Sequence, residues 1–80
     1  MNVINFTGMQ IDKSHTLVKF GKRFKHLRVI NNYTQSELAM ELGVEISQIS
    51  RIERGLINTS VFMIYQVAQV LNIPPSSFFE

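Results

Sequence analysis

Residues Gln35 to Arg54 read QSELAMELGVEISQISRIER and contain two short apolar patterns at helical spacing, separated by a glycine. Ala39 is small enough for two helices to approach each other closely. Gly43 can adopt the positive φ that ends a helix. Ile49 has the position expected for the inner face of the second helix. The segment therefore predicts two short helices joined by a tight turn, and the rest of the chain is interpreted around it.

The composition predicts one small domain. The chain has 80 residues, of which 45% are apolar, and this is near the size at which a single core becomes marginal. It has no cysteine, which excludes disulfides and thiolate metal sites and favours a reduced intracellular setting. Its apolar stretches are too short to span a bilayer, and the start MNVINFTGMQIDKSH lacks the pattern of a secretion signal. We therefore expect a cytoplasmic protein with no membrane partner.

The basic residues are unevenly distributed. The net charge is only +2, but all eight basic side chains lie between Lys13 and Arg54, and no acidic residue occurs from Lys13 to Ser36. A local positive face of this kind attracts phosphate, although charge alone favours an ordinary solvated helix face. The basic residues before Ser36 are Lys13, Lys19, Lys22, Arg23, Lys25 and Arg28, accompanied by His15 and His26.

The periodicity predicts an all-α fold of five helices. We expect helices over 16–30, 46–53 and 60–71, one helix that opens at Thr34, and a last turn that starts at Pro74 and Pro75. Thr34 and Glu37 have the spacing of a capping box, whereas Glu45 is a weaker cap for the helix that follows it. The apolar residues predicted to face inward are Leu17, Phe20, Phe24, Leu27, Val44, Ile49, Ile52, Val61, Ile64, Val67 or Ala68, and Leu71.

The segment from about Phe20 to Phe79 resembles the phage repressor and Cro type (XRE-like) of helix-turn-helix family. The resemblance is carried by the Leu27-Arg28 pair, by TQSELA, LGV and ISRIERG, and by the run from Ala68 to Ile73. It implies a five-helix bundle of the lambda-repressor-like DNA-binding type. Compact single-domain members include phage regulators and the controller proteins of restriction-modification systems.

The resemblance also implies roles for individual residues. The base-contacting positions of the family fall on Ile46, Ser47, Gln48 and Arg51, and its backbone-contacting positions on Gln35, Ser50, Arg54, Asn58 and Thr59. The family's structural ion pair falls on Arg28 and Glu53, which assigns Glu53 to the fold and not to DNA contact. Ile46 departs from the polar residue frequent at its position. Taken singly, Ser47, Gln48 and Ser50 are more typical of an ordinary surface than of a DNA contact, and only the set as a whole favours DNA.

Several side chains of the fourth predicted helix are apolar where the family usually has polar ones. They widen the apolar surface beyond one core stripe, and a shared face with a second copy would bury the excess. We therefore expect a two-fold homodimer with recognition helices about 34 Å apart. The alternative is a tightly wrapped core with a few exposed aromatic rings. The expected interface residues are Phe62, Met63, Tyr65, Ile73, Pro74, Pro75, Phe78 and Phe79.

Residues 1–15 lie outside the resemblance, and we assign the DNA-binding domain with its C-terminal dimerisation region to 16–80. Three alternatives stay open for the first segment: disorder, an arm or short strand packed across the dimer, or a phosphate contact through Lys13 and His15. The chain has no glycine-rich phosphate loop and no cluster of histidines and carboxylates. We accordingly expect no enzyme activity, metal, cofactor or small-molecule effector.

Two functions remain as hypotheses. The first is a sequence-specific double-stranded DNA-binding transcriptional regulator, a repressor or controller that binds a pseudo-palindromic operator as a homodimer. The second is an antitoxin-like interaction module whose protein partner binds the apolar face of the fourth predicted helix. Arg51 and its polar neighbours favour the first hypothesis. The operator sequence does not follow from the chain, because DNA shape and docking angle also decide which bases are read.

Overall fold

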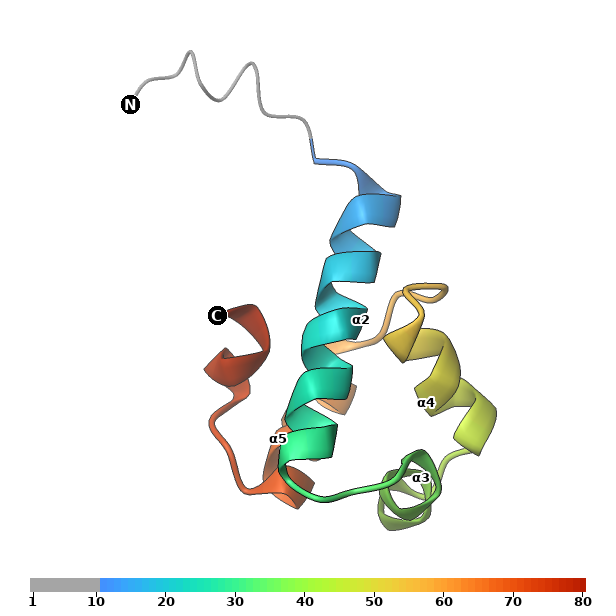
Figure 1. Cartoon of the computed structure of the whole chain (residues 1–80), viewed down its shortest axis with the longest axis vertical. Helices are drawn as coiled ribbons and strands as arrows, with labels where there is room; N and C mark the ends of the chain where they lie inside the picture. The colour runs from blue at the N-terminus through green and yellow to red at the C-terminus, as the bar shows by residue number, and fades with distance from the viewer. Residues whose placement is uncertain (1–10) are drawn as a thin grey trace.

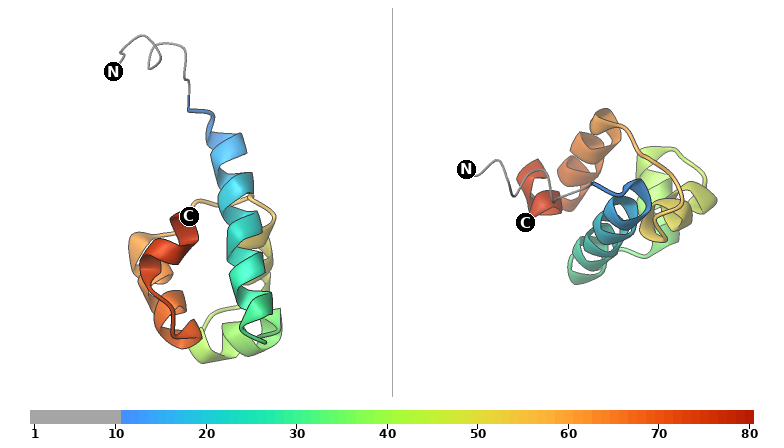
Figure 2. Two further views of the ribbon diagram at one scale, coloured as in Figure 1. Left: turned by 60° about the vertical axis from the view of Figure 1, so that its left-hand side comes forward. Right: turned by 90° about the horizontal axis from the view of Figure 1, so that it is seen from above.

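A computed structural model describes residues 11–80, which form four α-helices and a C-terminal 3-10 helix, with no strand in that range. Helix α2 lies between α4 on one side and η1 on the other, and α3 lies near the C-terminal end of α2 (Figure 1). Helix α5 passes behind α2 in that view and lies beside η1 (Figure 2). The all-α class is as predicted, and the fifth predicted helix is a 3-10 helix. The elements are α2 (Lys13–Ile30), α3 (Gln35–Leu42), α4 (Ile46–Glu53), α5 (Val61–Leu71) and η1 (Pro75–Phe79).

Helix α2 begins earlier than predicted, at Lys13 instead of residue 16. The cause is local, because the carboxylate of Asp12 accepts a hydrogen bond of 3.1 Å from the backbone N–H of His15. An aspartate at this position satisfies an otherwise unpaired N–H group of the first turn. Lys13 and His15 therefore belong to α2, whereas the alternatives for residues 1–10 lie outside the described part of the chain.

Each of the four α-helices is followed, one or two residues after its last residue, by a residue in the left-handed backbone conformation; these are Asn32, Gly43, Gly55 and Asn72. In each case the N–H groups of this residue and the next one donate to carbonyls of the last turn, which satisfies acceptors that the helix leaves unpaired. At Gly43 the φ is 71°, and the N–H of Val44 donates to the carbonyl of Ala39 at 3.0 Å. The predicted ends at Gly43, Asn72 and the Asn31-Asn32 pair are confirmed.

The helix starts also follow the sequence. Thr34 and Glu37 form the predicted capping box, with hydrogen bonds of 3.0 and 2.9 Å between each side chain and the other residue's backbone N–H. The side chain of Ser60 caps α5 by accepting from the N–H of Met63. Glu45, the weaker cap predicted for α4, makes no capping hydrogen bond. These signals place the starts of α3, α4 and α5 within one residue of the prediction.

The core contains side chains from α2, α3, α4 and α5, and its most buried members are Phe24, Leu38, Ile49, Ile52 and Val67. One expectation is wrong: Val61 is 70% exposed, whereas Met63 is buried. The buried residues of α5 centre its inner stripe between Ile64 and Val67, which places Val61 at one margin and Met63 at the other. Helix α5 packs against α3 and η1, and Val61 remains in solvent.

Candidate nucleic-acid interface

The inner face of helix α4 packs in the core, and its outer face carries polar and basic residues. Ile49 and Ile52 are 0% and 1% exposed, whereas Ser47 and Arg51 are exposed. Ile46, the first residue of α4, is 49% exposed and so presents an apolar surface to solvent. Gln48, the fourth predicted base-contacting residue, is half-buried. The helix thus offers an outward face on which hydrogen-bonding groups and one apolar side chain occur together.

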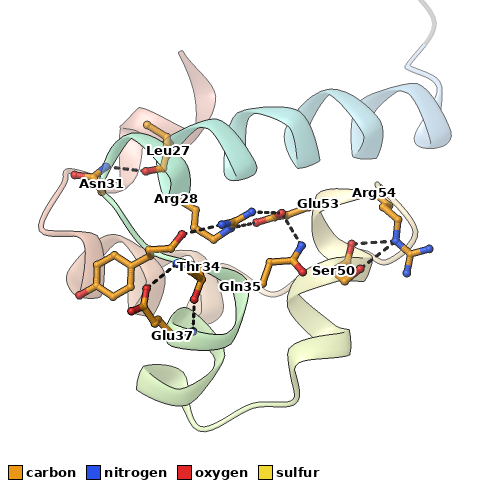
Figure 3. Close-up of polar contacts among 10 residues, drawn as sticks. Leu27, Arg28, Asn31, Thr34, Gln35, Glu37, Ser50, Glu53 and Arg54 are labelled. Atoms are coloured by element: carbon orange, nitrogen blue, oxygen red, sulfur yellow. Dashed lines mark hydrogen bonds and ion pairs between the residues drawn. The ribbon is translucent and has the colours of Figure 1, made fainter.

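The predicted ion pair between Arg28 and Glu53 is present and buried. The guanidinium Nε of Arg28 lies 2.6 Å from Oε2 of Glu53, and Nη2 donates to Oε1 at 2.9 Å (Figure 3). The third nitrogen of the same guanidinium, Nη1, donates to the backbone carbonyl of Tyr33 at 2.7 Å. This arrangement joins α2 to the last residue of α4 and to the loop before α3, so it fixes α4 relative to both.

Gln35 joins the same network, which the sequence did not indicate. Its side-chain amide donates to Oε1 of Glu53 at 2.9 Å (Figure 3). Within residues 11–80, no buried side-chain nitrogen or oxygen lacks a hydrogen-bond partner. The start of α3, the end of α4 and the C-terminal half of α2 are therefore held together by one satisfied polar cluster.

Two other predicted contact residues bond each other. The guanidinium Nε of Arg54 lies 3.2 Å from Oγ of Ser50 and 3.4 Å from the Ser50 carbonyl oxygen (Figure 3). Both groups belong to the C-terminal end of α4, and Arg54 is exposed. The contact orients Arg54 while leaving its two terminal nitrogens free to bind an anion.

The other predicted backbone-contacting residues, Gln35, Asn58 and Thr59, fall at two places. Gln35 lies at the C-terminal end of α2, in an open groove bordered by Val29 and Ile46. Asn58 and Thr59 lie on the loop before α5, beside Thr16 and Leu17 in the first turns of α2 and away from Gln35. The side chains of α4 lie between these two places, so the three sets together outline one extended surface along α2 and α4.

Helices α2 and α4 approach closely because of a glycine. A Cβ atom on Gly21 would lie 2.5 Å from the carbonyl oxygen of Ile52 and 2.6 Å from that of Glu53. Both are backbone atoms, so no side-chain rotation could make room. The absence of a side chain at Gly21 therefore sets the distance between α2 and the end of α4.

The apolar region predicted for dimerisation is only partly at the surface. Met63 and Phe78 are 8% and 2% exposed and belong to the core of the chain, so their assignment to an exposed interface is wrong. Phe78 is buried because η1 packs its ring against Phe20 and Phe24 of α2, with centroid distances of 6.0 and 5.8 Å. The sequence alone could not distinguish these side chains from their exposed neighbours.

The other predicted interface residues, apart from Pro74, line two separate grooves. Phe62 and Tyr65 are 71% and 59% exposed and share one groove with Ile73 and Pro75. Phe79 is also exposed but lies against Phe20 of α2, in a second groove that Phe78 also lines. Pro74 is exposed and lines neither groove. The first groove thus contains four of the predicted interface residues, and the second contains two.

Sequence comparison identifies the family. The profile of the helix-turn-helix family HTH_3 matches residues 24–78, a range that includes α3, α4 and every predicted DNA-contacting residue. The chain belongs to this helix-turn-helix family. Its α3 and α4 are the two helices of the motif, and α4 has the position of the recognition helix.

Relatives in the helix-turn-helix family include transcriptional regulators and an antitoxin. The uncharacterised regulator YazB of Bacillus subtilis is 39% identical over 54 residues, which are 68% of this chain and 78% of YazB. Antitoxin HipB of Escherichia coli is 31% identical over 65 residues, 81% of this chain and 69% of HipB. The chain spans 45% of the length of two rhizobial regulators that it also matches.

A solved structure of the family has the same fold. The restriction-modification controller protein C.AhdI from Aeromonas hydrophila superposes with a TM-score of 0.77 at 37% identity, covering 81% of this chain and 98% of that chain. The fold expected from the family resemblance is therefore the observed one. Across residues 11–80, no helix has the length and apolarity to cross a membrane, and no group of three or more histidine or carboxylate side chains could hold a metal ion.

Proposed function

We propose that the protein is a sequence-specific double-stranded DNA-binding transcriptional regulator, a repressor or controller that acts as a homodimer on a pseudo-palindromic operator. The observation that carries this proposal is the fixed orientation of α4. The buried cluster of Arg28, Glu53 and Gln35 holds this helix so that Ser47 and Arg51 face outward. A helix with this support and this outer face can enter the major groove without rearrangement.

Each outward residue of α4 has a chemistry suited to a base edge. Arg51 can donate two hydrogen bonds to O6 and N7 of guanine, and Gln48 can pair with adenine. Ser47 can bond to several base edges, and the half-exposed Ile46 can contact a thymine methyl group. Among these, Arg51 contributes most to base choice, because a bidentate arginine contact discriminates by about 1–3 kcal/mol against a wrong base.

A second set of residues binds phosphates and thereby fixes the register of the protein on DNA. One N–H of the Gln35 amide is used by Glu53, and the other remains for a phosphate oxygen. Arg54, oriented by Ser50, offers its terminal nitrogens at the end of α4. Asn58 and Thr59 add contacts from the loop before α5. These residues position α4 but do not read the sequence.

The dimer forms through the groove that contains Phe62 and Tyr65. These two rings are the largest exposed apolar side chains of α5, and Ile73 and Pro75 border them. A two-fold axis through this region would present two copies of α4 to successive turns of the major groove, about 34 Å apart. We further propose that the protein acts in the cytoplasm and has no catalytic activity of its own.

Selection from a random double-stranded DNA pool tests this function, with Arg51→Ala and Arg54→Ala variants run in parallel. The wild type should enrich an inverted repeat. Arg51→Ala should relax the choice at one position of each half-site, whereas Arg54→Ala should weaken binding to all sequences alike. A folded wild-type protein that enriches no sequence would defeat the proposal, and enrichment of a single, unrepeated site would defeat its dimeric part.

An antitoxin-like interaction module is the second candidate. The similarity to HipB and the exposed rings of Phe62 and Tyr65 favour it. In this case the groove on α5 binds a different protein instead of a second copy. Co-expression with the product of the neighbouring gene, followed by purification through that product, distinguishes the two. A complex lost on Phe62→Ser and kept on Arg51→Ala would support the second candidate.

A further inference from the structure

The arginines of α2 make contacts within the chain, and its lysines do not. Arg28 is buried with Glu53. The Nε of Arg23 donates to the backbone carbonyl of Ser77 at 2.7 Å, and its Nη2 lies 3.6 Å from Oε1 of Glu80. Both arginines therefore serve to hold other parts of the chain against α2.

The lysines have no such structural role. All are exposed, and within residues 11–80 none takes part in an ion pair. No acidic residue occurs between Lys13 and Ser36, or in residues 1–10. The positive charges on the outer side of α2 thus have no counter-charge on the same helix. The lysines concerned are Lys13, Lys19, Lys22 and Lys25.

Two of these lysines lie on the stripe of α2 that borders α4. A Cβ on Gly55, which follows α4, would lie 2.7 Å from the Cα of Val18, so the end of α4 packs beside this end of the stripe. The other end, Val29, lines a groove together with Ile46, the first residue of α4. The stripe therefore runs beside α4 from end to end. It has the helical spacing i, i+4, i+7 and i+11 and consists of Val18, Lys22, Lys25 and Val29.

The dimensions of DNA indicate which part of the duplex would lie next to this stripe of α2. A helix about 10–12 Å across fills a major groove about 12 Å wide. Packed helices have axes about 8–10 Å apart, and the close contact at Gly21 favours the shorter distance. When α4 occupies the groove, the adjacent edge of α2 therefore lies over the sugar–phosphate wall of that groove.

We propose that Lys22 and Lys25 bind phosphates of the DNA strand that borders the major groove occupied by α4. This inference rests on the proposed function and adds a contact site on α2. The lysines supply affinity without sequence preference, because phosphates are the same at every base pair. Lys13 provides a matched comparison, because it lies in the first turn of α2, before the stripe, and lines none of the grooves described above. Lys19 is left out of the comparison, because it lines the same groove as Asn58 and Thr59.

The salt dependence of DNA binding tests the proposal. We would compare the wild type with the single variants Lys22→Gln, Lys25→Gln and Lys13→Gln, each of which removes one positive charge. Dissociation constants would be measured between roughly 50 and 200 mM salt on the selected operator duplex and on a scrambled duplex of equal length. Each phosphate contact contributes about 0.9 to the slope of log K against log salt.

For Lys22→Gln and for Lys25→Gln we expect a slope reduced by about 0.9 on both duplexes, so that over this salt range the wild type loses about three- to fourfold more affinity than either variant. Lys13→Gln should leave the slope close to that of the wild type. Equal reductions in all three variants would mean that only net charge matters, and an unchanged slope in the first two would mean no contact. Either result overturns the proposal.

Two further readouts separate this proposal from the proposed function. A wild-type protein that binds both duplexes equally defeats sequence-specific recognition, while the slope on the scrambled duplex still tests the lysines. Binding to neither duplex defeats both. Thermal unfolding of the three variants should match that of the wild type, because all three lysines are exposed. If the melting temperatures match, the differences in salt slope between the variants and the wild type report on DNA contact and not on loss of structure.

Discussion

Arg28 and Glu53 lie 25 positions apart in the sequence, and two hydrogen bonds of 2.6 and 2.9 Å join their side chains in the interior. The pair crosses from α2 to the last residue of α4, which is the helix proposed to read DNA. Gln35 at the start of α3 donates to the same carboxylate. A structural ion pair thus determines where a functional surface points, although neither of its members is proposed to touch a base.

Removal of one member of the pair should be more harmful than removal of both. Glu53→Met leaves the Arg28 guanidinium buried without a counter-charge, and we expect a loss of about 3–5 kcal/mol in the free energy of unfolding. Arg28→Met should cost a similar amount. The double variant should lose less than either single variant, because two apolar side chains can pack in the same space and leave no buried charge unpaired. Urea unfolding of the four proteins measures this, and additive losses would contradict a coupled pair.

Gly21→Ala should destabilise the protein even though alanine favours helix. The gain in helix propensity is about 1 kcal/mol, whereas overpacking against backbone atoms typically costs about 1–3 kcal/mol. The cost of overpacking should exceed the gain in helix propensity, because the new Cβ would lie 2.5 Å from the Ile52 carbonyl oxygen. His26→Ala, at an exposed position of the same helix, is the control. A melting temperature raised by Gly21→Ala would show that α4 can move away at little cost.

Thr34→Ala should lower the stability by about 1 kcal/mol. The change removes the hydroxyl that accepts from the N–H of Glu37, and with it one half of the capping box. Ser36→Ala, two residues on at an exposed position, removes a hydroxyl that makes no capping bond and should have little effect. Thermal unfolding by circular dichroism measures both. Equal losses in the two variants would mean that the cap contributes nothing of its own.

Phe62→Ser should change the association of the protein, whereas Met63→Ala, at the neighbouring position, should change its stability. Phe62 is 71% exposed, so its replacement should shift a dimer toward monomer with little change in the stability of the chain. Met63 is 8% exposed, so its truncation should cost about 2–5 kcal/mol by leaving a cavity. Sedimentation equilibrium and urea unfolding separate the two effects. An unchanged association state in Phe62→Ser would remove this groove as the dimer interface.

The sequence by itself determined the local structure of this protein. The helix caps and turns depend on local residue types, because their side chains and backbone groups bond to groups only a few residues away. Examples are the capping box of Thr34 and Glu37, the turn at Gly43 and the helix end at Asn72. The early start of α2 at Asp12 is of the same kind and could have been predicted from its preference for the N-cap. The family resemblance likewise placed the recognition helix and the Arg28–Glu53 pair.

Only the tertiary structure decided which of several apolar side chains became core and which remained at the surface. Met63 and Phe78 are buried while Val61 and Phe79 are exposed, because the rotation of α5 and the docking of η1 on α2 depend on all helices at once. The same holds for Gln35, whose bond to Glu53 requires α3 and α4 to meet at one place. Helical periodicity limits the choice to a face, and the angle between packed helices selects the residue.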